Sequence, residues 1–400
     1  MDTRQVSRRA ALGGAALLGT TALAGGARAA AAVRIGVLTD ESGPYRDSGG
    51  AGSILAARMA VQDFGGSVLG KPVEIVHADT QNKPDVAAAL ARQWYDSGVD
   101  AVTDLPVTPV AAAVQQVARE KVRTVMITAS AVSEFTSKWC SPVSSHWADD
   151  THAMAHVAST LLTRAGGTTW FFITVDFSFG HRLQAAATEV IAANGGRVLG
   201  TALFPLGTSE FSAQIVQAQS AGAKVIGLIA VGNDQVNLIK QSAEFGLRRG
   251  GAQLAGYLVY ITDVHALGLK AAQGLTFASS YYWDQNDEAR NFARRFAATH
   301  GAMPTKNQAT IHAATLHFLK AMARAGTRDA VAVNRAMRAL PVAFFGRAAS
   351  LRSDGRLLYD VPVWRVKAPA ESHAPWDDYA PAGTLPAAEA FLPANPACPT

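Results

Sequence analysis

Short apolar runs rich in β-branched residues alternate along this chain with longer alanine-rich stretches, whose apolar positions recur every three or four residues. The first pattern is typical of buried strands and the second of amphipathic helices. Regular alternation of the two predicts a parallel sheet with crossover helices. In the first part of the chain the predicted strands are residues 33–38, 73–78, 101–103 and 124–127, and the predicted helices are residues 52–64, 84–96 and 110–120.

The same alternation restarts near residue 170. Predicted strands there are residues 170–175, 197–203, 225–230, 254–261 and 274–282, and predicted helices are residues 181–193, 212–219, 235–245, 288–300 and 308–326. The turn Ser97-Gly98-Val99-Asp100 has a similar counterpart in Ala221-Gly222-Ala223-Lys224. This repeat indicates two similar α/β lobes. A late hairpin turning at Asp354-Gly355 follows, and beyond Pro375 the Pro- and Ala-rich sequence predicts a surface tail.

The first 29 residues have the pattern of an export signal. Residues 10–26 are almost wholly Ala, Leu, Gly and Thr, and Ala27-Arg28-Ala29 offers small residues for cleavage. Arg8-Arg9 before a weakly apolar, Gly-rich run predicts a twin-arginine signal peptide over residues 1–29. The alternative is a transmembrane anchor, but the run is short and rich in glycine. Because no cysteine follows the run, we expect a soluble periplasmic protein without a lipid anchor.

Charge and size exclude several classes of protein. Without residues 1–29 the chain loses four arginines and one aspartate, so its formal net charge falls from +5 to +2. That charge is too small for a nucleic-acid or membrane-binding surface. The remaining length exceeds what one hydrophobic core usually serves, which predicts two domains. Two cysteines remain, and in an oxidising compartment we expect a Cys140–Cys398 disulfide that ties the tail to the first lobe. Two unpaired buried thiols are the alternative.

Motifs for catalysis lack their required context. Asp47-Ser48-Gly49-Gly50 resembles the nucleophile region of trypsin-like proteases, but it follows the first strand of an α/β lobe. The chain has no Gly-x-Ser-x-Gly elbow, Walker loop or His-Glu-x-x-His motif. Gly50-x-Gly52 is a partial dinucleotide signal in which Leu55 replaces the third glycine. We therefore predict no enzyme and no cofactor, with an exported cofactor-dependent oxidoreductase as the alternative.

A histidine cluster is the one candidate metal site. His152 and His156 stand four residues apart on a predicted helix, with His146, Asp149 and Asp150 nearby. No second ligand group at a defined spacing supports zinc. We interpret the segment as a polar crossover between lobes, followed by a helix with acidic residues at its start, and we predict no metal.

Aromatic residues gather at the ends of predicted strands rather than within them. In open α/β sheets the crevice for ligands lies beyond the carboxyl ends of the strands. These aromatics therefore predict the walls of a pocket: Tyr45, Trp147, Phe177, Phe179, Tyr260, Tyr281, Tyr282 and Trp283.

The chain also resembles a known family. The matching segments are Gly36-Val37-Leu38-Thr39-Asp40-Glu41-Ser42-Gly43-Pro44-Tyr45, Gly49-Gly50-Ala51-Gly52, Asp79-Thr80-Gln81-Asn82-Lys83-Pro84, Thr128-Ala129-Ser130, Phe179-Gly180 and Ala221-Gly222-Ala223. In this order and spacing they resemble the type I periplasmic solute-binding proteins of the leucine/isoleucine/valine-binding family. The match runs over most of the chain beyond residue 29.

The resemblance implies an α/β fold of two doubly wound parallel-sheet lobes joined by a three-crossover hinge. The crossovers would lie near residues 147–150, 278–281 and 357–359. Lobe 1 would then comprise residues 30–148 and 280–358, and lobe 2 residues 149–279 and 359–377. Residues 378–400 would form the C-terminal tail tethered to lobe 1.

The resemblance also implies capture of a small carboxylate-bearing ligand between the lobes and delivery to an ABC transporter permease, by a protein that acts as a monomer. First-lobe contacts would come from Ser42, Tyr45, Val107, Thr108, Ser130 and Ala131. Second-lobe contacts would come from Phe177, Phe179, Asp234 and Asp263, with Trp147 and Trp283 as further walls. Phe179 stands where the family has a tyrosine, and Asp263 substitutes for a glutamate. The ligand is therefore either amino-acid-like or an aromatic acid, and a ligand sensor for a membrane partner is the alternative function.

Overall fold

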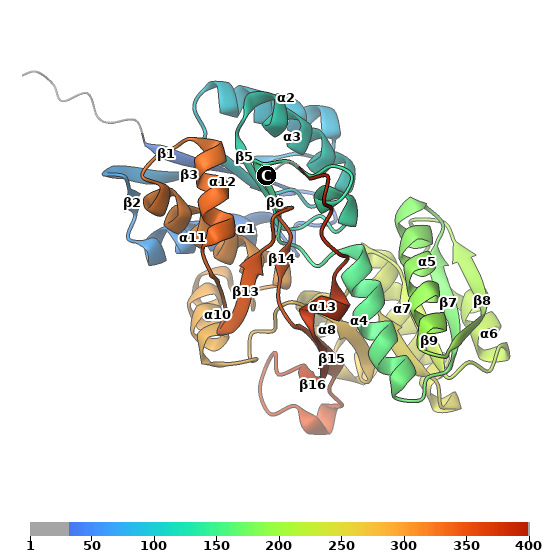
Figure 1. The fold of residues 1–400 in the computed structure, drawn as a ribbon. Coiled ribbons are helices and arrows are strands. Elements are labelled where there is room, and N and C mark those ends of the chain that lie inside the picture. Colours follow the sequence, from blue (N-terminus) through green and yellow to red (C-terminus); the bar gives the residue numbers. More distant parts are fainter. Residues whose placement is uncertain (1–31, 399–400) are drawn as a thin grey trace, which may run out of the picture. The chain divides into compact units, whose positions relative to one another are not determined.

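The computed structural model describes residues 32–398, which contain two large β-sheets, each covered by helices (Figure 1). The predicted α/β fold with two lobes is confirmed. The predicted signal peptide lies outside the described residues. Within residues 32–398, no helix combines the length and the apolar character needed to cross a membrane.

Lobe 1 is built around a six-stranded sheet in the order β2-β3-β1-β4-β5-β6, parallel except for β2. Its strands are β1 (Val33–Thr39), β2 (Ser67–Val68), β3 (Lys71–Asp79), β4 (Ala101–Asp104), β5 (Thr124–Ile127) and β6 (Ser144–His146). Its helices are α1 (Gly50–Phe64), α2 (Pro84–Asp96), α3 (Thr108–Lys121), the 3₁₀ turn η1 (Ser133–Thr136), α10 (Asp287–His300), α11 (Lys306–Ala325) and α12 (Ala330–Ala339). A small antiparallel sheet adds β12 (Val342–Phe344), β13 (Arg347–Leu351) and β14 (Leu357–Leu358).

Strand β1 is apolar at successive positions because helices cover both faces of its sheet. Ile35 and Val37 are buried in the cluster that includes α1 and α11, whereas Leu38 is buried in the cluster that includes α2 and α3. Successive strand residues point to opposite faces, so both sets must be apolar. Gly36 leaves room for Trp94 of α2, since a Cβ there would lie 2.4 Å from the indole ring.

Lobe 2 is built around a seven-stranded sheet in the order β16-β15-β11-β10-β9-β7-β8. Strand β15 is antiparallel to both of its neighbours, β11 and β16, and the other pairings are parallel. Its strands are β7 (Thr169–Val175), β8 (Arg197–Phe204), β9 (Val225–Ile229), β10 (Gln253–Gly256), β11 (Leu275–Ala278), β15 (Val361–Val366) and β16 (Tyr379–Leu385). Its helices are α4 (Thr151–Arg164), α5 (Ser178–Ala193), α6 (Ser212–Ser220), α7 (Gly232–Glu244), η2 (Leu247–Gly250), α8 (Ile261–Leu267), α9 (Leu269–Ala272), η3 (Pro369–Glu371) and α13 (Ala387–Ala390).

The short sequence repeat has the same place in both lobes. Gly98 ends the turn between α2 and β4, and Gly222 ends the turn between α6 and β9. Both adopt a left-handed backbone, with φ of 88° and 61° respectively, which glycine adopts without a steric penalty. The repeat therefore marks an equivalent helix-to-strand turn.

Three predicted segments differ from the structure. The strand predicted over residues 274–282 covers only Leu275–Ala278. The predicted strand over residues 254–261 ends at Gly256, and Ile261 already begins α8. The apolar run continues because Tyr257 and Val259 are buried in the loop. The predicted irregular tail is wrong for Tyr379–Leu385, which form edge strand β16. Pro381 within this strand has the signature of a turn in sequence, but an edge strand tolerates proline.

Three connections join the two lobes: residues 147–150 between β6 and α4, residues 279–286 between β11 and α10, and residues 359–360 between β14 and β15. They meet at Asp149, whose carboxylate accepts hydrogen bonds from the Tyr359 hydroxyl (2.6 Å) and the Ser280 backbone N–H (3.1 Å). Lys306 Nζ lies 3.1 Å from the same carboxylate. Burial opposes ionisation of this group, but Lys306 and the hydrogen bonds prevail, so the Asp149 pKa is lowered.

Candidate ligand-binding site

The loop after β1 is shaped by the carboxylate of Asp40. It accepts hydrogen bonds from the backbone N–H of Gly43 (2.6 Å) and of Tyr45 (2.9 Å), and from the side-chain amide of Asn82 (2.8 Å). This arrangement holds Tyr45 beyond the carboxyl end of β1, where open α/β sheets bind ligands. Burial raises the pKa of Tyr45, and the negative charges of Asp40 and of Asp234 in lobe 2 raise it further. The Tyr45 hydroxyl therefore lies within electrostatic range of Asp234 in lobe 2.

Two hydroxyl groups come together in lobe 1. Thr108, the first residue of α3, and Ser130, in the loop after β5, place their side-chain oxygens 3.2 Å apart. Their neighbours Val107 and Ala131 are partly buried. The first N–H groups of a helix have no partner within the helix and carry partial positive charge. Hydroxyls at such a terminus can bind a carboxylate.

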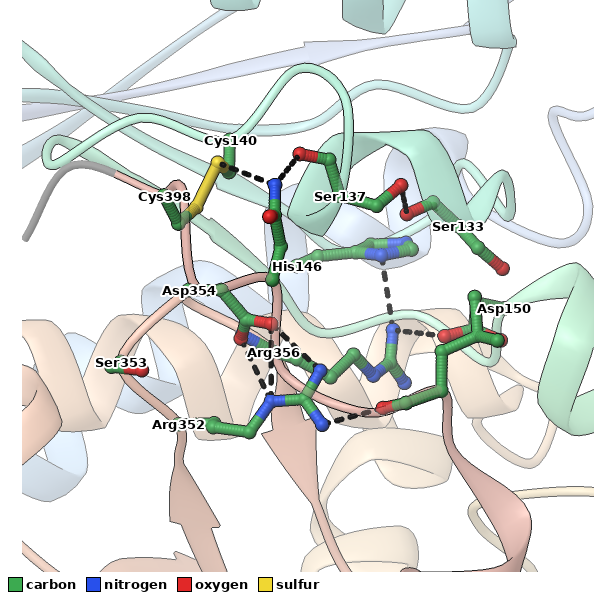
Figure 2. Close-up of polar contacts among 12 residues, drawn as sticks. Ser133, Ser137, Cys140, His146, Asp150, Arg352, Ser353, Asp354, Arg356 and Cys398 are labelled. Carbon is green, nitrogen blue, oxygen red and sulfur yellow. Dashed lines mark hydrogen bonds and ion pairs between the residues drawn. A yellow bond between two sulfur atoms is a disulfide. The ribbon is translucent and has the colours of Figure 1, made fainter.

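A buried histidine fixes the backbone of the Ser130 loop. His146 Nε2 lies 2.8 Å from the Ser130 carbonyl oxygen. Its Nδ1 lies 3.0 Å from a guanidinium nitrogen of Arg356, a contact that Figure 2 shows. Because a guanidinium only donates, Nδ1 is the acceptor and Nε2–H donates to Ser130. Burial, and then the charge of Arg356, lower the His146 pKa to about 3. Arg356 also lies 3.4 Å from Asp150, the N-cap of α4.

Ser42 is not brought together with this hydroxyl pair. Its hydroxyl is exposed and donates to Asp79 at 2.6 Å. Asp79 ends β3, which lies on one side of β1, whereas Thr108 and Ser130 follow β4 and β5 on the other side. The hydroxyl groups among the predicted first-lobe contacts thus divide into a Thr108–Ser130 pair and a separate Ser42.

Lobe 2 contributes two acidic residues in the first turns of helices. Asp234 of α7 is buried and accepts a hydrogen bond from the Gly207 N–H at 2.8 Å. Asp263 belongs to the first turn of α8. Burial raises the Asp263 pKa to about 7, a backbone hydrogen bond from Tyr260 lowers it, Asp47 raises it and Lys306 lowers it. Asp263 therefore lacks enough positive charge nearby to stay fully ionised at neutral pH.

Phe177 and Phe179 flank the start of α5. Their rings stack with centroids 5.9 Å apart, and both side chains are partly buried. Phe179 packs against the same lobe 2 cluster as Ala131 of lobe 1. The ion pair between Glu134 of η1 and Arg182 of α5 also joins the two lobes. The Ser130 loop and the start of α5 are therefore neighbours.

The aromatic residues predicted as pocket walls divide between the core of lobe 1 and a small cavity. Trp147 is fully buried in the core of lobe 1, where its ring contacts His317, which contradicts its predicted role as a wall. Tyr281 and Tyr282 are also buried, and their hydroxyls donate to backbone carbonyls. Both nevertheless line a small cavity together with Tyr260, Trp283 and Lys306. These aromatic residues follow the ends of strands but lie in the connections packed between the lobes. Their place in the sequence alone therefore does not distinguish a core residue from a pocket wall. Trp283 is partly buried and its indole N–H donates to the Trp376 carbonyl at 2.7 Å.

Sequence reasoning missed the start of α11 as part of the site. Thr305 and Gln308 form a capping box there, which places Lys306 and Asn307 in the first turn. Asn307 donates to the Tyr260 hydroxyl of lobe 2 at 3.3 Å, and Lys306 Nζ lies 5.3 Å from the centre of the Tyr260 ring. The signal available in sequence was Thr305-x-x-Gln308, but it identifies a helix start and not what the helix faces.

The histidine cluster separates in the structure. His152 and His156 stack on α4 with ring centroids 4.5 Å apart, whereas His146 is bonded to Ser130 and Arg356. No group of three or more His, Cys, Asp or Glu side chains within residues 32–398 is arranged to hold a metal ion.

Two α/β lobes joined by three connections, with Asn307 of lobe 1 in contact with Tyr260 of lobe 2, have the architecture of a two-lobed ligand-binding protein. The profile of the periplasmic binding protein family matches residues 32–372, and the chain belongs to this family, in its type I leucine/isoleucine/valine-binding branch. No curated protein sequence matches the chain.

Solved structures agree with this assignment. The chain is 40% identical to a periplasmic binding protein from Burkholderia mallei, with a TM-score of 0.84 and coverage of 90% of this chain and 96% of that one. It is 35% identical to a branched chain amino acid ABC transporter periplasmic ligand-binding protein from Burkholderia xenovorans, with a TM-score of 0.86 and coverage of 90% and 97%. A Rhodopseudomonas palustris solute-binding protein in complex with benzoate shares the fold at 19% identity, with a TM-score of 0.78 and coverage of 89% and 97%.

Proposed function

We propose that this protein is the extracytoplasmic solute-binding component of an ABC importer, which captures a small carboxylate-bearing ligand between its two lobes by hinge closure. The observation that carries the proposal is the Thr108–Ser130 hydroxyl pair at the start of α3, in a loop that continues to Ala131 and Glu134 and so to lobe 2. A ligand that contacts both lobes stabilises the conformation in which they meet, because only differential affinity shifts such an equilibrium.

The ligand we favour is amino-acid-like. Hydroxyls and helix N–H groups in lobe 1 suit a carboxylate, and Asp263 in lobe 2 suits an ammonium group. A buried carboxyl group with a raised pKa becomes more stable in its ionised form when a cation binds beside it. The relative from Burkholderia xenovorans, named for branched chain amino acids, supports the same class. An aromatic acid would leave Asp263 without a cation.

The partner would be an ABC transporter permease, which receives the ligand from the closed protein. The pattern over residues 1–29 supports export to the periplasm. The role requires no cofactor and no chemical change of the ligand.

A thermal-shift panel of the purified protein tests this function. Amino acids, amides, aliphatic acids and aromatic acids are added separately, and a ligand at 100 times its Kd should raise the stability by about 2.7 kcal/mol. Small-angle scattering should then show a smaller radius of gyration with that ligand, and mass spectrometry should recover the ligand unaltered. An altered product would favour an enzyme, and a saturated protein no more compact than the free one would contradict hinge closure.

A further inference from the structure

The C-terminal segment begins in lobe 2. Strand β16 pairs with β15 in the lobe 2 sheet, and α13 then packs against α4. The side chain of Glu389 in α13 accepts from Arg164 of α4 at 3.1 Å. Asp360, at the third connection, accepts from the N–H of Ala387 at 2.9 Å. The segment is thus attached to lobe 2 through residue 390.

The segment then passes beside the third connection between the lobes. The Phe391 ring contacts the Tyr359 ring with centroids 5.4 Å apart, and the Arg356 guanidinium lies 4.6 Å from the Phe391 ring centre. An open groove of about 820 Å³ lies between α4 and this segment, with Leu358 and Arg352 in its wall. The groove leaves one side of the C-terminal segment without packing contacts. The segment can therefore move when the angle between the lobes changes.

The last described residues are attached to lobe 1. The Leu392 carbonyl accepts from Arg352 at 2.6 Å, and the Asn395 side chain donates to the Ser137 carbonyl at 2.6 Å. Cys398 forms a disulfide with Cys140, which confirms the predicted pairing (Figure 2). The two cysteines are 258 residues apart in sequence, so the covalent ring they close contains all three connections.

We propose that residues 386–398, closed by the Cys140–Cys398 disulfide, form a strap that limits how far the two lobes open. A fully extended chain spans at most about 3.3–3.6 Å per residue. One end of the strap is attached to lobe 2 and the other to lobe 1, so its length sets an upper limit on their separation. The non-covalent contacts of Leu392 and Asn395 can exchange with water, whereas the disulfide cannot open without a reductant. A cross-link removes extended conformations from an ensemble, so the strap narrows the range of open forms from which closure starts.

Reduction of the folded protein tests the strap without a mutation. Dithiothreitol supplies two electrons and two protons, which convert the disulfide to two thiols while the reagent forms its own cyclic disulfide. The radius of gyration of the ligand-free protein, from small-angle scattering, should increase, whereas that of the ligand-bound protein should stay the same. The affinity for the ligand identified in the thermal-shift panel should fall about three- to tenfold, because closure then starts from a broader ensemble. The ligand-free measurement does not depend on the proposed function.

The double variant C140S/C398S should reproduce these changes without a reductant. If that variant does not fold, E389A supplies the test, since it weakens the strap at its lobe 2 end and should give a smaller change in the same direction. R92A removes an ion pair within lobe 1, between Arg92 and Glu120, and should leave both measurements unchanged. An unchanged ligand-free radius in the reduced, folded protein would overturn the proposal and leave the disulfide as an anchor of the chain end only.

Discussion

Replacing Asp263 by asparagine should remove a pH dependence of ligand binding. In the ligand-free protein, burial raises the Asp263 pKa to about 7, so this carboxyl group is protonated in mildly acidic solution. An ammonium-bearing ligand should bind the ionised form, and its own amine remains charged over the same pH range. The wild-type affinity should therefore rise with pH until Asp263 is fully ionised.

The size of this effect follows from the pKa. With a value of about 7, about 3% of Asp263 is ionised at pH 5.5 and about 90% at pH 8. If only the ionised form binds the ammonium group, the affinity should increase about 30-fold over this interval. Isothermal titration calorimetry at half-unit steps of pH measures the change, and it should also detect a proton released on binding near pH 6.

The asparagine variant should bind weakly and equally at all these pH values. D287N is a matched control, because the Asp287 side chain is 98% exposed in the first turn of α10, and it should keep the wild-type pH profile. A pH-independent wild-type affinity, or a D263N protein that retains the 30-fold rise, would refute the assignment of Asp263 as the cation-binding group.

Three further outcomes follow from the site. S130A should weaken binding about 10- to 150-fold, the loss expected for one hydrogen bond to a charged group, whereas S42A should change the affinity less than about twofold by calorimetry. F179A should cost about 1–3 kcal/mol of binding free energy through lost aromatic burial. The ligand-free protein should remain folded, with a lower melting temperature because Phe179 also packs against the lobe 2 cluster. The unfolded chain protonates His146 at pH values where the folded protein, with a pKa of about 3, does not. The free energy of unfolding should therefore fall as the pH falls from about 6.5 to 3, and denaturant titration should show a smaller fall in H146N.

The arrangement of strands and helices could be predicted from sequence because parallel strands covered on both faces are apolar along their whole length. Strand β6 was missed, since Ser144–His146 is a buried but polar strand whose side chains bond to Gln115 of helix α3 and to the Ser130 carbonyl. Edge strand β16 was missed because its central residues are exposed, so they show no run of buried apolar positions. Hydrophobic pattern identifies elements that bury apolar side chains and does not identify these two.

The candidate site was predictable only in part. The Thr108–Ser130 pair follows from the general rule that ligands bind beyond the carboxyl ends of parallel strands. Lys306 was not predictable, because its position depends on a helix that returns to lobe 1 after the chain has built most of lobe 2. Trp147 was misassigned because a connection between lobes is itself a packed element.

The meeting of three connections at Asp149 has a practical consequence for following this protein in solution. In the proposed hinge closure, a carboxylate that holds Tyr359 and Ser280 at once should limit sliding of one lobe past the other, so that the lobes change mainly their angle. Points near Asp149 should then scarcely move, and points far from it should move most. Energy transfer between a donor dye near Asp149 and an acceptor dye on the rim of either lobe should change little. Energy transfer between dyes on the two opposing rims should change with the angle between the lobes.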